Sequence, residues 1–164
     1  MTSEGDPRLQ LRLLALMVNE MLTSYIELEN KITRSQATFR SLVARLLGRR
    51  IPYEEFVRDL AETESRWSVV LDMVAKARQD LQLSTSVNEQ RFVEALWSYT
   101  VAVRDAVAVL GESQRQLERI SLGSNPTNPT FGDIAHSQAL YRAAVQRYLD
   151  CGIKLNSLNP LIFD

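Results

Sequence analysis

The 164-residue sequence has few of the residues from which most catalytic and metal sites are built, because it contains one histidine, His136, and one cysteine, Cys151. A lone cysteine excludes an intrachain disulfide and a cage of thiolate ligands. A lone histidine excludes the paired Glu-x-x-His motifs of a di-iron bundle. Asp133, His136 and Ser137 lie too close together on one helix to align as a hydrolase triad. We therefore expect no enzymatic activity, no metal and no cofactor.

Other signals are also missing. The sequence has neither the glycine-rich dinucleotide fingerprint nor a phosphate loop. No apolar run is long enough to span a bilayer, and the first residues are acidic where a secretory signal would be basic. A formal net charge of −1 creates no field toward nucleic acid or an anionic membrane. These absences predict a cytoplasmic protein that does not insert into a membrane.

The five prolines fall only where a helical pattern needs boundaries. Asp6 and Pro7 make a favourable helix start, and Ser86 to Glu89 has the sequence of a capping box. Gly152 follows the last periodic segment as a candidate C-terminal cap. These signals predict four helices, over residues 7–48, 52–83, 87–121 and 133–151.

Apolar residues recur every seventh position along the first of these segments, with a second set between them. Such an a/d pattern is typical of helices that pack as in a coiled coil. The other three segments also carry one apolar stripe each. The first set is Leu11, Val18, Tyr25, Ile32, Phe39 and Leu46, and the second is Leu14, Met21, Leu28, Ser35 and Leu42.

Together these patterns predict an all-α fold. We expect a single domain over residues 1–164, an elongated antiparallel bundle with three long helices, a shorter fourth helix and an apolar tail over residues 153–164. A short connection between helices makes them antiparallel neighbours.

The first segment carries a second apolar stripe outside the a/d pattern, formed by Leu9, Leu13 and Leu16. One buried seam does not need this stripe. The chain also closes on large apolar side chains around Pro160. If the fourth helix ends at Cys151, an extended tail can reach the second stripe and complete the core. The alternative is that these residues meet a second copy of the chain, as in a homodimer, or another protein. The candidate interface is Leu9, Leu13, Leu16, Leu158, Leu161, Ile162 and Phe163.

Charge is distributed unevenly along the chain. Residues 7–50 carry eight basic and three acidic side chains, whereas residues 51–90 carry four basic and eight acidic ones. The simplest interpretation is that the two segments pair with each other. A basic strip at the end of the first helix is a candidate contact for nucleic acid, although no aromatic side chains or known motif accompany it. This strip is Arg40, Arg45, Arg49 and Arg50.

Long amphipathic helices without convergent polar chemistry favour an interaction module, such as an adaptor, a scaffold or an assembly subunit, with a protein partner or itself. Two alternatives remain. A small-molecule sensor would bury its ligand between helices near Trp67, Trp97 and Tyr99. A nucleic-acid accessory subunit would use the basic strip. We also expect Tyr25 and Tyr99 to need buried hydrogen-bond partners.

Overall fold

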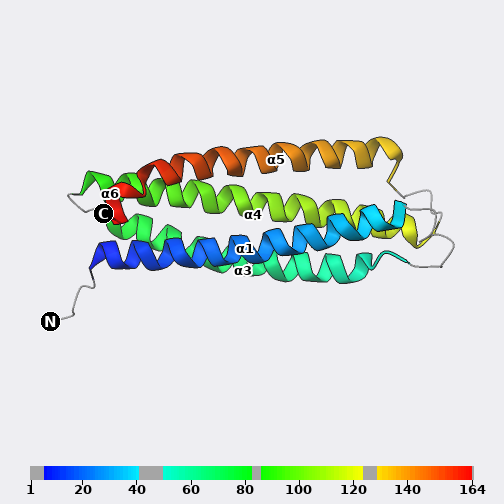
Figure 1. Cartoon of the computed structure of the whole chain (residues 1–164), viewed down its shortest axis with the longest axis horizontal. Helices are drawn as coiled ribbons and strands as arrows, with labels where there is room; N and C mark the ends of the chain where they lie inside the picture. The colour runs from blue at the N-terminus through cyan, green and yellow to red at the C-terminus, as the bar shows by residue number, and fades with distance from the viewer. Residues whose placement is uncertain (1–5, 41–49, 83–85, 124–128, 164) are drawn as a thin grey trace.

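The computed structural model describes residues 6–40, 50–82, 86–123 and 129–163, and for residues 38–40 it describes the backbone alone. Within these residues there is no β-strand, and four long helices alternate in direction along one axis (Figure 1). The prediction of an all-α antiparallel bundle is confirmed. The helices are α1 (Pro7–Arg40), α3 (Tyr53–Leu81), α4 (Val87–Ser121) and α5 (Phe131–Leu158), followed by the short α6 (Pro160–Phe163).

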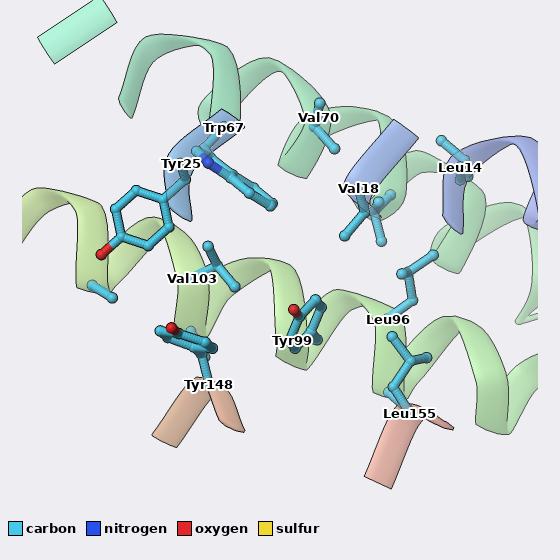
Figure 2. Close-up of a cluster of buried hydrophobic side chains, with 14 of the residues drawn as sticks. Leu14, Val18, Tyr25, Trp67, Val70, Leu96, Tyr99, Val103, Tyr148 and Leu155 are labelled. Carbon is cyan, nitrogen blue, oxygen red and sulfur yellow. The ribbon is translucent and has the colours of Figure 1, made fainter. Parts of the chain in front are cut away.

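The heptad pattern of α1 forms the inner face of the bundle. Leu11, Val18, Tyr25 and Ile32 are all buried, and Leu14 between them is buried as well. The later heptad positions, from Phe39 onward, lie outside the described side chains. Figure 2 shows α1 contributing Leu14, Val18 and Tyr25 to one cluster with side chains from the other three long helices. These partners are Trp67, Val70, Leu96, Tyr99, Val103, Tyr148 and Leu155.

The start of α1 agrees with the sequence, whereas the predicted capping box does not form. The Asp6 carboxylate accepts a hydrogen bond from the Arg8 backbone N–H at 3.0 Å. Ser86 makes no side-chain cap at the start of α4. Glu89 is buried, and its carboxylate accepts a hydrogen bond from Arg8 Nε at 3.3 Å. This contact between α1 and α4 takes the place of the predicted bond from Glu89 to the backbone at the start of its own helix.

A capping box occurs instead at the start of α5. The hydroxyl of Thr130 accepts from the Asp133 backbone N–H, and the Asp133 carboxylate accepts from the Thr130 backbone N–H at 2.7 Å. The helix therefore begins two residues before the predicted start at residue 133. Asp133 occupies the third helical position and not the cap.

The predicted end of the fourth helix is wrong. We expected it to end at Cys151, with Gly152 as its cap and an extended tail from residue 153. The helix α5 instead continues through Gly152 to Leu158, so its 28 residues nearly match the 29 of α3. A capping glycine usually adopts positive φ, but within the described residues only Gly123 does so. Gly152 serves close packing, because an added Cβ would lie 3.1 Å from Cε2 of Tyr99.

Gly111 and Gly152, which both face neighbouring helices, give a matched test of close packing at Gly152. A Cβ at Gly111 of α4 would lie 3.8 Å from Leu60 Cβ, which is ordinary contact. Gly111→Ala should therefore raise the free energy of unfolding by up to about 1 kcal/mol through helix propensity. Gly152→Ala should not show this gain, because the ring of Tyr99 must move. Urea denaturation of both variants measures the difference, and an equal gain in both would contradict close packing at Gly152.

Candidate functional site

The second stripe of α1 lies on the outer surface. Leu9, Leu13 and Leu16 are 55%, 57% and 57% exposed. Their spacing of four and three residues places them on one face of the helix, opposite the buried Leu11 and Val18. The prediction that the chain's own tail covers this stripe is wrong. Only at the edge of the stripe do the two approach each other, where Leu16 and Phe163 line the same hollow.

The tail closes the end of its own bundle at a different place. Ile162 in α6 is 1% exposed, and its carbonyl oxygen accepts from Nε and Nη2 of Arg12 at 3.2 and 2.8 Å. The ring of Phe163 meets Phe92 edge to face with centroids 5.9 Å apart, and the Arg12 guanidinium lies 5.4 Å from its centroid. Leu158 packs against the core, while Leu161 stays partly exposed. In Figure 1, α6 lies at the end of the bundle where α1 begins.

The basic strip is mostly outside the described residues. This applies to the side chain of Arg40 and to Arg45 and Arg49, whereas Arg50 is described and exposed. The expected pairing between the basic and acidic segments occurs at Lys31, whose Nζ lies 2.5 Å from Glu55 and 3.7 Å from Asp59.

The structure does not assemble the aromatic sensor site. Trp67 is fully buried in α3, and its indole N–H has no partner within the described residues. Trp97 lies under the guanidinium of Arg78, 4.3 Å from the ring centroid. Two residues along α4, Tyr99 points to nearly the opposite side of that helix and packs against Gly152. The three side chains therefore do not face one cavity.

A hydrogen-bonded pair of tyrosines bridges α1 and α5. The hydroxyls of Tyr25 and Tyr141 are 2.8 Å apart, and Tyr141 donates to Oε1 of Glu29 at 2.7 Å. Because each hydroxyl carries one proton, Tyr25 must donate to Tyr141. The expectation of a partner for Tyr25 is confirmed, whereas Tyr99 makes no hydrogen bond within the described residues. The sequence did not identify Tyr141 as the partner, although both tyrosines lie on inward stripes.

Burial controls the ionisation of these tyrosines. It raises the pKa of Tyr25 and of Tyr141 well above the ordinary value of 10.0, and the neighbouring Glu29 carboxylate raises both further. Burial also raises the pKa of Tyr99 to about 12. The pKa values of Tyr53 and Tyr148 are raised for the same reason, so all five tyrosines of the chain resist ionisation.

Two hollows lie between α1 and α5, one on each side of the tyrosine bridge. The one nearer α6 has a volume of about 300 Å³ and is lined by side chains such as Leu16, Tyr99 and Leu155, with no charged residue. The other has a volume of about 320 Å³ and a mixed polar and apolar lining that includes Glu29, Gln114 and Arg142.

Over the described ranges, no three His, Cys, Asp or Glu side chains gather in a way that could hold a metal ion. The helices in these same ranges include none that is both long and apolar enough to cross a membrane.

No protein-family model matches this chain, and no curated protein or solved structure matches it either.

The buried tail can be tested by substitution. Ile162→Ala should lower the free energy of unfolding by about 2–5 kcal/mol, toward the lower end because a chain terminus can relax around the lost volume. Leu161→Ala changes an exposed neighbour and serves as the control. Chemical denaturation followed by circular dichroism measures both, and equal losses would contradict the burial of Ile162.

The tyrosines predict loss of stability in alkali. Below pH 10 both the folded and the unfolded chain keep the phenol protons. Above pH 10 the unfolded chain loses protons that the folded chain still holds, so the free energy of unfolding falls as pH rises. Absorbance at 295 nm should therefore show less tyrosinate above pH 10 in the folded protein than in the unfolded chain. A normal titration near pH 10 in the folded protein would contradict the burial.

The tyrosine bridge can be removed by deleting one oxygen atom, the hydroxyl oxygen of Tyr141. Tyr141→Phe deletes two hydrogen bonds and should cost about 1–2 kcal/mol at neutral pH. Tyr53→Phe is the control, because Tyr53 is half-buried and outside the bridge. Thermal unfolding at pH 7 compares the two variants, and an equal effect would show that the bridge adds no stability.

Proposed function

We propose that this protein is a non-enzymatic interaction module, an adaptor or an assembly subunit, that binds a partner protein through the outer face of α1. The proposal rests on the leucine stripe, which we define as Leu9, Leu13 and Leu16. Each of these side chains is more than half exposed, on a helix whose inner seam is already filled. A contiguous apolar patch on a surface is typical of an interaction site. A cytoplasmic location is part of the same proposal.

The size of the stripe favours a different protein over a second copy. Three half-exposed leucines cover on the order of 300 Å², the size of the largest apolar patch on an ordinary monomer. A stable dimer buries about 800 Å² on each partner. A homodimer held by the stripe alone would therefore be weak, and a stable complex needs contacts farther along α1.

The rest of the same face indicates which partner fits. Glu20 and Glu27 continue the spacing of the stripe, are exposed, and make no salt bridge within the described residues. The matching partner is an amphipathic helix, with apolar side chains opposite the leucines and Lys or Arg opposite these two glutamates. Helices bind in this way through apolar anchors spaced by three or four residues.

Affinity capture from the native source tests the proposal with four baits. These are the wild-type chain, Leu13→Glu, Glu20→Lys, and Leu140→Glu, which changes a leucine of α5 that is 48% exposed. The three variants should keep the wild-type melting temperature, because all three sites face solvent. A partner bound by the wild type and by Leu140→Glu should be lost with Leu13→Glu and weakened by Glu20→Lys.

Two results would contradict the proposal. One is that Leu13→Glu captures the same proteins as the wild type. The other is a concentration-dependent dimer in sedimentation equilibrium that Leu13→Glu leaves intact, because the interface would then lie elsewhere.

A further inference from the structure

The inner face of α4 changes from apolar to polar near its C-terminal end. Tyr99, Val103, Ala106 and Leu110 are buried as the stripe predicts. One turn later the inward positions are Ser113 and Gln114, which are only 6% and 2% exposed. A bundle core needs an apolar side chain at such positions, so the polar pair requires an explanation.

The hydrogen bonds of this pair are incomplete. Gln114 accepts from the Nε2 amide of Gln36 on α1 at 3.1 Å. The hydroxyl of Ser113 and the amide N–H groups of Gln114 have no partner within the described residues. Among the described residues, the buried side-chain polar atom that lacks a partner is Trp67 Nε1, so the unpaired atoms of Ser113 and Gln114 are open to solvent. Both residues line the hollow of about 320 Å³, so their free groups are available to a molecule bound there.

Two opposite charges stand at this hollow on facing helices. Glu29 of α1 accepts one hydrogen bond, from Tyr141. Arg142 of α5 donates only from Nε, to the carbonyl of Gln138 in its own helix at 3.4 Å. No salt bridge joins Glu29 to Arg142, and neither has another ionic partner in the described part of the chain. Each charge is therefore free to bind an opposite charge on a ligand.

We propose that this hollow binds a small zwitterion with an apolar side chain, of the class of hydrophobic α-amino acids. The ammonium group of the ligand pairs with Glu29 and its carboxylate with the Arg142 guanidinium, in charge-assisted hydrogen bonds. Its apolar side chain packs on Ile32, Leu110 and Leu117, which also line the hollow. Ser113 and Gln114 supply the remaining polar contacts.

The volume limits the ligand class. Ligand pockets in proteins span about 300–1,000 Å³, so this hollow is at the small end of that range. It suits an amino acid better than a nucleotide or a long lipid chain. The second hollow is of similar size but has no charged lining residue, so it offers no way to recognise a zwitterion. This inference is independent of the proposed partner helix, which binds the outer face of α1.

Isothermal titration calorimetry with L-leucine, L-methionine and L-phenylalanine tests the proposal on the full chain. At least one of them should bind saturably and raise the melting temperature. Its N-acetyl derivative, which lacks the ammonium group, and its amide, which lacks the carboxylate, should each bind about tenfold more weakly.

Two variants locate the site. Arg142→Gln should weaken binding about tenfold, and Ser113→Ala should weaken it less, because one neutral hydrogen bond is lost. Arg142 is exposed, so its substitution leaves the fold intact. Arg147→Gln is the control, since Arg147 lies on α5 beside Asp105 of α4 and away from the hollow.

Three results would overturn the proposal. The first is no saturable binding of any of the three amino acids up to about 10 mM. The second is binding that Arg142→Gln leaves unchanged, which would place the ligand elsewhere. The third is that the derivatives that lack one charge bind as tightly as the parent amino acid. Only the apolar side chain would then be recognised, and Ser113 and Gln114 would serve helix register alone.

Discussion

The bundle depends on α4, the helix against which all the others pack. Fifteen of its 35 residues are buried, compared with three in α5. Burial on several sides explains why α4 carries small residues such as Ala102 and Ala106, which allow close approach of its neighbours. The same constraint reaches α5, where Gly152 lets the Tyr99 ring lie against the helix backbone. A side chain at that position has to displace the ring, so α4 fixes both the path of α5 and the place where the tail begins.

Much of this fold could be predicted from the sequence, because period and punctuation are local signals. The heptad residues of α1, the helix over 87–121 and the helical start at Pro7 all follow from them. Two of the errors share a physical cause, since in each a tertiary contact replaces a local preference. Glu89 pairs with Arg8 on another helix instead of capping its own. Gly152 meets an aromatic ring instead of ending α5.

The candidate site was predictable only in part. Surplus leucines on α1 and an apolar tail are visible in the sequence, but the structure separates them, because Arg12 and Phe92 hold α6 at the end of the bundle. The tyrosine bridge could not be predicted, since the partner of Tyr25 depends on how far α5 lies from α1. The burial of Ser113 and Gln114 could not be predicted either, because a glutamine beside an apolar stripe has the sequence pattern of a surface residue.

Two regions of the described chain carry residues that folding alone would not select. Leucine lies on the outer face of α1 at three positions where a polar side chain would make the protein more soluble. Serine and glutamine lie inside α4 at two positions where an apolar side chain would stabilise the core. Natural sequences mostly agree with their folds at every level, and departures from that agreement concentrate at functional positions. The outer face of α1 and the hollow lined by Ser113 are therefore the two places where we propose that this bundle binds other molecules.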